Sequence, residues 1–247
     1  RSTLFPYTTL FRSTNRVAAQ LYSTRSTRSW GLGDAEDLAD LAALAADRGA
    51  DFLLINPIHA SAPIAPLENS PYLPVSRRWL NPIYIRPEMI DEYSHASLAV
   101  VKAIEELRVL ANSSDTTDAL VDRDRSWEAK RRALEMIFPL PRSYHREAQF
   151  QHFITEGGED LRHFATWCAL VEANESMILP EEVASSSMPQ SDRARLELAD
   201  RVEFWQWCQW IVAEQMEDAQ RVAKSVGMDI GMMADLAVGV HPQGSEV

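Results

Sequence analysis

A tyrosine held between two prolines is the first feature of this sequence that could do chemistry. In the segment NSPYLP, Pro71 and Pro74 each fix a backbone angle and restrict the residue before them, so the ring of Tyr72 is presented at little entropic cost. An aromatic face beside polar groups, here Asn69 and Ser70, suits a ligand with an apolar C–H face and a rim of hydroxyls, such as a pyranose. The alternative is a structural loop whose aromatic residues plug the domain.

A carboxylate within an apolar run is the second feature. Asp235 stands in the segment MMADLAVGV, where burial of its charge is costly unless the group is paired or functional. At the C-terminal end of a parallel strand it would face the active-site side of an α/β barrel, and a structural ion pair is the alternative. His59 follows a strand end, but no His, Cys or carboxylate stands near it at metal-ligand spacing, so we predict no metal site.

Three other motifs favour packing or local structure over chemistry. Cys168 and Cys208 lie in apolar, helix-like stretches and are predicted to be buried reduced thiols. The segment FWQWCQWIV (204–212) is apolar nearly all round and indicates a core helix. The GLGD segment (31–34) indicates a turn and a helix cap, because it lacks the three spaced glycines of a dinucleotide site. No cofactor is implied.

The elements that must position these residues form repeated strand and helix units. Residues 17–22 and the apolar run 51–56 are candidate strands, and Asp34 is a good N-cap for a helix that ends at Gly49. The junction GADFLLIN recurs as GMDIGMMAD after a long helix that we expect from about Ser191 to Val226. The repetition predicts an α/β fold with a parallel sheet.

The chain between these units has no strong strand signal and reads as a helical insertion. Candidate helices span 99–110, 127–137, 159–172 and 193–226, and polar breaks at 112–118 and 184–192 separate them. We expect strand and helix units over 16–60, a loop and helical subdomain over 61–190, and a long helix with a third strand over 191–247. The head, 1–15, resembles a translated sequencing adapter and is excluded from fold reasoning.

Composition limits the possible partners. The 247 residues carry a net charge of -12, which disfavours a nucleic-acid partner bound through phosphates and suits a neutral substrate. No run of 18 apolar residues is present, so no membrane span is expected. The sequence shows no signal peptide, which makes the cytoplasm the expected compartment. The oligomeric state cannot be inferred from the sequence.

Four segments together resemble a known family. SWGLGDAEDL, INPIHA, NSPYLPVSRRWLNPIYI and DLAVGV resemble bacterial 4-alpha-glucanotransferases, the amylomaltases of the α-amylase superfamily, over residues 16–247. The resemblance implies a (β/α)8 barrel that transfers α-1,4-glucan segments between maltooligosaccharides through a glycosyl-enzyme intermediate. It also implies that Tyr72 stacks on the sugar beside the scissile bond, that Ser70 is a neighbouring polar contact and that Asp235 organises that subsite. His59 and Asn81 stand in matching motifs.

The chain departs from the family in its catalytic carboxylates. The family nucleophile lies in an Arg-x-Asp-His pattern downstream of the strand that carries Asp235, with the general-acid Glu later still, and no such pattern occurs here. A retaining mechanism needs two carboxyl groups about 5–5.5 Å apart, and the sequence offers no pair to nominate. We therefore expect an N-terminal fragment with about three of the eight barrel strands, no catalytic residues of its own, and no activity alone.

Other function classes remain open. The chain could belong to another α-amylase-superfamily enzyme such as a hydrolase, or it could be a non-catalytic maltooligosaccharide-binding module that uses Tyr72. A helical interaction protein is a further alternative. It leaves both the proline-held tyrosine and Asp235 without a role.

Overall fold

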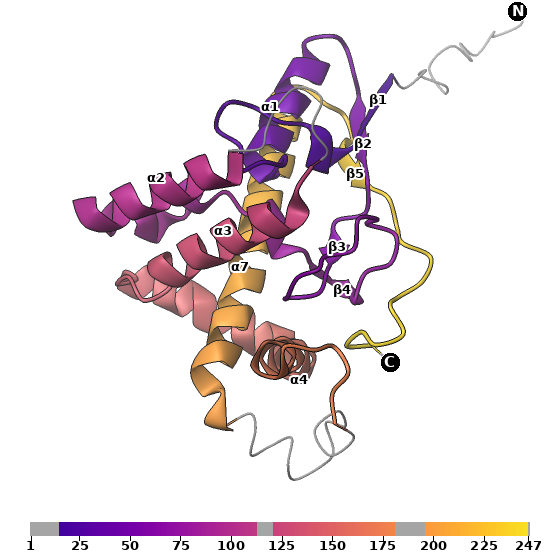
Figure 1. The fold of residues 1–247 in the computed structure, drawn as a ribbon. Helices are drawn as coiled ribbons and strands as arrows, with labels where there is room; N and C mark the ends of the chain where they lie inside the picture. Colours follow the sequence, from indigo (N-terminus) through magenta and orange to yellow (C-terminus); the bar gives the residue numbers. More distant parts are fainter. Residues whose placement is uncertain (1–14, 113–120, 181–195, 247) are drawn as a thin grey trace, which may run out of the picture.

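The computed structural model describes residues 15–112, 121–180 and 196–246, and Figure 1 shows their arrangement. Nearly all of the adapter-like head lies outside the described residues. The polar break 184–192 and most of the break 112–118 also lie outside them.

A small parallel sheet forms one side of the molecule (Figure 1). Its strands are β1 (Arg16–Ala19), β2 (Phe52–Ile55) and β5 (Gly231–Ala234), in the order β1-β2-β5, and both pairings are parallel. The sequence prediction of a parallel α/β sheet is therefore confirmed. The first strand is shorter than expected, because the chain turns into the 3-10 helix η2 (Leu21–Ser23) after Gln20.

The first helix begins and ends where its capping residues predict. The side chain of Asp34 accepts hydrogen bonds from the backbone N–H groups of Glu36 and Asp37 at the start of α1 (Ala35–Ala46). The side chain of Asp37 accepts a hydrogen bond from the backbone N–H of Asp34, which completes a capping box. Gly49, with φ of 80°, follows the helix in a left-handed conformation that favours glycine.

An antiparallel hairpin follows β2, where the sequence predicted only a loop. It pairs β3 (His59–Ala60) with β4 (Ser76–Leu80), and the segment between them carries the NSPYLP motif. Three 3-10 turns come next: η3 (Pro82–Tyr84), η4 (Pro87–Met89) and η5 (Asp91–His95). The prediction missed the hairpin because a strand of two residues shows no periodicity.

Four more α-helices lie in the described residues: α2 (Leu98–Asn112), α3 (Arg123–Ile137), α4 (Tyr144–Asn174) and α7 (Ala199–Ser225). Helix α4 begins well before the predicted residue 159. Its continuity is interrupted at Gly158, which has a non-helical φ of 53°. The sequence pattern therefore revealed only the second half.

Helix α7 is the central element of the core. It contacts α1, α4 and β5, and in Figure 1 it runs through the middle of the molecule. Trp205 and Trp207 are 1% and 0% exposed, which confirms that the aromatic segment is a core helix. Cys168 and Cys208 are buried free thiols as predicted, and burial raises the pKa of both well above the usual value. No helix in the described ranges is both long and apolar enough to cross a membrane.

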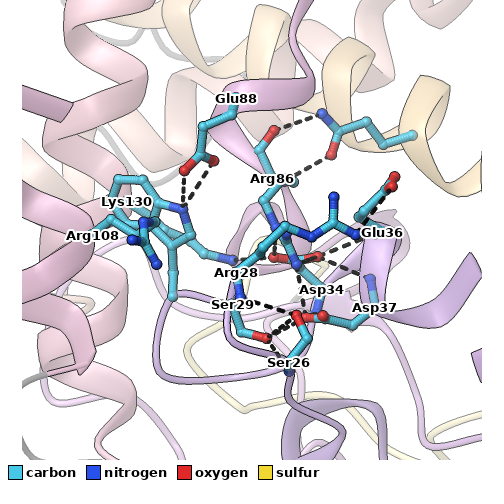
Figure 2. Close-up of polar contacts among 12 residues, drawn as sticks. Ser26, Arg28, Ser29, Asp34, Glu36, Asp37, Arg86, Glu88, Arg108 and Lys130 are labelled. Atoms are coloured by element: carbon cyan, nitrogen blue, oxygen red, sulfur yellow. Dashed lines mark hydrogen bonds and ion pairs between the residues drawn. The ribbon is translucent and has the colours of Figure 1, made fainter. Parts of the chain in front are cut away.

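Figure 2 shows a buried cluster of charges at the start of α1. The guanidinium group of Arg86 donates to both carboxylate oxygens of Asp34, at 2.6 and 2.8 Å, and lies 3.0 Å from the carboxylate of Asp37. On α3, the ammonium group of Lys130 lies 3.7 Å from Asp34. It also donates to the carbonyl oxygen of Ile83 at 2.5 Å.

The cluster balances two carboxylates against two cations, and all four side chains are buried. Burial lowers the pKa of Lys130 to about 8 and raises the pKa of Asp34. Burial disfavours the charged form of Arg86 as well, but its two carboxylate partners outweigh burial and raise its pKa. Gln215 on α7 hydrogen-bonds to both backbone polar groups of Arg86, at 2.8 and 3.0 Å. The cluster therefore joins α1, α3 and α7.

Candidate functional site

A polar residue directly follows each of the three parallel strands, at the same edge of the sheet. The last residues of β1, β2 and β5, namely Ala19, Ile55 and Ala234, are paired in register. The next residue in each strand is therefore a neighbour of the others, and these are Gln20, Asn56 and Asp235. Ligands of parallel α/β sheets bind outside the carboxyl ends of the strands, so this edge is the natural candidate site.

The loop between β3 and β4 brings Tyr72 to this edge. The hydroxyl of Tyr72 donates to the carboxylate of Asp235 at 3.1 Å, although the two residues are 163 positions apart. The backbone N–H of Tyr72 donates to the hydroxyl of Ser70 at 3.3 Å, which helps to hold the loop. The hydrogen bond to Asp235 raises the pKa of Tyr72.

Tyr72, Asp235 and the strand ends surround an open hollow of about 180 Å³. Its lining also includes Leu54, Asn56 and Gln20. Tyr72 is 46% exposed, so part of the residue remains available for contact. Pockets for drug-sized ligands usually hold about 300–1,000 Å³, so a hollow of this size suits one sugar ring or a comparably small polar ligand.

The environment of Asp235 differs from the prediction. Asp235 stands at the C-terminal end of a parallel strand as expected, directly after the last residue of β5, but it is exposed and not buried inside the strand. Its backbone N–H donates to Ile55 at 2.9 Å, and its carboxylate accepts from the N–H of Leu236 at 2.9 Å. The side chain of Asp235 is exposed because this edge of the sheet opens onto the hollow. Asp235 has no ion pair in the part of the chain that the structure describes, so the structural alternative has no support there.

Three other predicted residues lie around a second, more enclosed cavity. His59, Ser70 and Asn81 line this cavity, which does not include Tyr72 or Asp235. The side chain of Asn81 accepts a hydrogen bond from the N–H of Ile83 at 3.1 Å and caps η3.

Asn69 is exposed on the same loop and lines neither cavity. The six predicted residues therefore do not form one site. Tyr72 and Asp235 share a hollow, and Ser70 stabilises the loop through its hydrogen bond with the backbone of Tyr72.

His59 lies in β3 and is half-buried at the second cavity. Neither of its ring nitrogens makes a hydrogen bond of regular geometry within the described residues, although the backbone of Arg77 lies near. Burial and the positive charge of Arg77 lower its pKa, so the ring is neutral over more of the pH range. No group of three or more His, Cys, Asp or Glu side chains could hold a metal ion in the described part of the chain.

Sequence reasoning missed Asn56 and Gln20. The amide of Asn56 donates to the carbonyl of Pro57 at 2.7 Å and to the hydroxyl of Tyr84 at 3.1 Å. Its oxygen accepts from the backbone N–H of Leu21 at 2.7 Å. The available signal was a polar residue at the end of each apolar strand, in VAAQ and in FLLIN.

The arrangement can bind a neutral polar ligand, but the hollow has one carboxylate. Asp235 is the only acidic side chain among the described residues that line it. Cleavage of a glycosidic bond uses a pair of carboxyl groups on either side of the bond. The geometry of this hollow is therefore suited to holding a ligand and offers no pair of carboxylates for bond cleavage.

Comparisons with known proteins agree on one family. The sequence profile described as 4-alpha-glucanotransferase matches residues 19–247. The 4-alpha-glucanotransferases of Mycobacterium tuberculosis and Haemophilus influenzae are 43% and 31% identical to the chain, over 93% and 90% of its length.

Among solved structures, amylomaltase from Corynebacterium glutamicum matches 95% of the chain with a TM-score of 0.84 and 43% identity. Amylomaltase from Streptococcus agalactiae in complex with acarbose matches 94% of the chain with a TM-score of 0.77, and at 16% identity it supports the fold alone.

The chain spans about a third of the length of the curated relatives that it matches. It covers 33% and 34% of the two curated sequences and 32% of the Corynebacterium structure. The profile match covers nearly all of the chain, including the hairpin loop and the three strand ends. This protein chain therefore belongs to the 4-alpha-glucanotransferase family.

Proposed function

We propose that this chain carries part of the donor-sugar site of a 4-alpha-glucanotransferase. In this proposal the ring of Tyr72 stacks on a glucose unit, and the carboxylate of Asp235 accepts hydrogen bonds from its hydroxyls. The observation that carries the proposal is the contact between these two residues at the carboxyl edge of a parallel sheet. Aromatic stacking beside a fixed acceptor is a suitable arrangement for a pyranose.

The proposed reaction moves α-1,4-glucan segments between maltooligosaccharides with retention of configuration. The nucleophile and the general acid would come from sequence outside these 247 residues. The relatives are about three times longer than the stretch that they share with this chain, which supports this division of labour. In the same proposal β1, β2 and β5 are the first three strands of a (β/α)8 barrel, with the helical segment inserted between the second and the third.

Sugar binding by the chain tests the proposed site. Maltotriose is titrated into the 15N-labelled chain, and chemical-shift changes are followed by NMR. We expect the changes to centre on Tyr72 and Asp235 and to disappear in Tyr72→Ala. A matched control is Tyr144→Ala, which removes the same type of side chain from a more exposed position (93% exposed) at the start of α4, outside the lining of the hollow. Undiminished maltotriose binding by Tyr72→Ala would contradict the proposal.

The transfer reaction is tested in a chimera. Residues 16–247 replace the corresponding segment of the Corynebacterium glutamicum amylomaltase, which is 43% identical. With maltotriose as substrate, we expect glucose together with longer maltooligosaccharides, and we expect Tyr72→Ala to reduce both. The unfused chain should release neither product. A folded chimera that only hydrolyses maltotriose would favour the hydrolase alternative.

A further inference from the structure

The three strand ends play different roles, and the difference identifies a residue with a function of its own. Gln20, Asn56 and Asp235 are adjacent because the strands are in register, and all three line the hollow beside Tyr72. Asp235 is already engaged by Tyr72. The other two residues are Asn56 and Gln20. The side-chain amide of Asn56 is used to hold the structure, whereas that of Gln20 is free to bind a ligand.

Asn56 is a positioning residue. Both hydrogens of its amide are used, on Pro57 and on the hydroxyl of Tyr84, and its oxygen accepts from Leu21. Asn56 is also 2% exposed, so it has little surface to offer a ligand. Its effect is to fix the end of β1 against the end of β2.

The backbone of Gln20 is held from both sides by this arrangement. Its carbonyl oxygen accepts hydrogen bonds from the N–H of Ser23 at 3.0 Å and from the hydroxyl of Thr24 at 3.1 Å. The following residue, Leu21, is bound to Asn56 at 2.7 Å. The Cα of Gln20 therefore has a defined place at the rim of the hollow.

The side chain of Gln20, in contrast, has no partner within the described ranges. It is exposed and lines the hollow. The carboxylate of Asp235 acts as an acceptor, and the hydroxyl hydrogen of Tyr72 is committed to it. Among the described polar side chains around the hollow, the amide of Gln20 is thus the uncommitted donor.

We propose that Gln20 is a specificity-determining residue of this site, whose side-chain amide hydrogen-bonds to a hydroxyl group of the glucose ring that faces Tyr72. Each sugar hydroxyl can both donate and accept a hydrogen bond. The sugar can therefore donate to the carboxylate of Asp235 and accept from the amide of Gln20. A site with donor and acceptor in fixed places selects the sugar whose hydroxyls match them. The inference rests on the proposed function and adds a residue that determines which hydroxyl pattern is bound.

The test combines a side-chain change with changes in the ligand. Gln20→Met keeps the length of the side chain and removes both hydrogen-bonding groups. Loss of a neutral hydrogen bond is expected to weaken maltose binding by about 3- to 10-fold. The control is Gln151→Met, an exposed glutamine on α4, which should bind maltose as the unaltered chain does. Thermal unfolding of each variant verifies that the fold is retained.

A series of monodeoxy maltoses supplies the readout that a structural role would not change. The unaltered chain should bind one analogue more weakly than maltose, while Gln20→Met should bind that analogue and maltose equally. If Gln20→Met discriminates among the analogues as the unaltered chain does, the role of Gln20 is refuted and the Tyr72 site stands. If the unaltered chain binds no maltose, both the inference and the proposed function fail.

Discussion

Replacing Lys130 should change how the stability of the protein depends on pH. This lysine is fully buried, and its pKa is lowered to about 8 from an ordinary value of 10.5. Below about pH 8 the ammonium group of Lys130 stays charged in the folded protein, and the full free-energy cost of burying that charge lowers the stability. Between about pH 8 and 10.5 the unfolded chain binds more protons than the folded protein at this site, so stability rises with pH.

The size of the effect follows from the two pKa values. The difference between about 8 and 10.5, at about 1.36 kcal/mol per pH unit, corresponds to ~3 kcal/mol. In Lys130→Met the titrating group is absent. The free energy of unfolding of the unaltered protein should therefore rise by ~3 kcal/mol relative to Lys130→Met over this pH range. Other groups that titrate there are common to both proteins and cancel in the difference.

Urea unfolding followed by tryptophan fluorescence measures this difference at several pH values. Lys102→Met is the matched control, because the side chain of Lys102 is 80% exposed and should show no such dependence. At pH 7, Lys130→Met should cost little, since Arg86 still neutralises Asp34 and the cost of burying the ammonium group disappears. Parallel curves for the unaltered protein and Lys130→Met from pH 7 to 10.5 would refute the reasoning.

Three further predictions follow from the core and the site. Arg86→Met should destabilise the fold by about 3–5 kcal/mol in urea unfolding, because it leaves a buried carboxylate without its main partner; a loss below about 1 kcal/mol would contradict this. Trp205→Ala should cost about 3–5 kcal/mol by thermal unfolding, whereas Leu236→Ala, at 63% exposure, should cost almost nothing. Cys168 and Cys208 should react with a thiol reagent only after unfolding, and rapid labelling of the native protein would show that they are accessible.

Features that depend on a few neighbouring residues could be predicted from the sequence. The cap at Asp34 and the glycine stop at Gly49 set the first helix, because capping needs only the adjacent backbone groups. The repeated junctions before β2 and β5 predicted two parallel strands. The helix around Trp207 was predicted as core, since a segment that is apolar on all faces must be covered.

Other features were missed or predicted wrongly, because they depend on contacts between distant segments or on too few residues to form a pattern. The two-residue strand at His59–Ala60 has too few residues for a pattern, and its pairing with β4 is a long-range contact. The double glycine at 157–158 hid the first half of α4. The partners of Arg86 could not be inferred, because they stand 49 and 52 positions away and meet it only when α1 packs against the connecting segment.

By itself, the sequence determined the parallel strands, the cap and the glycine stop of the first helix, the core helix and the candidate side chains Tyr72 and Asp235. The tertiary structure alone decided which of these side chains share a hollow, that Asp235 is exposed, and that Gln20 and Asn56 lie beside it. Helix and strand patterns are local and repeat within a few residues. The site depends instead on the register of three strands and on a loop that brings together residues 163 positions apart, and this is fixed only when the whole core packs.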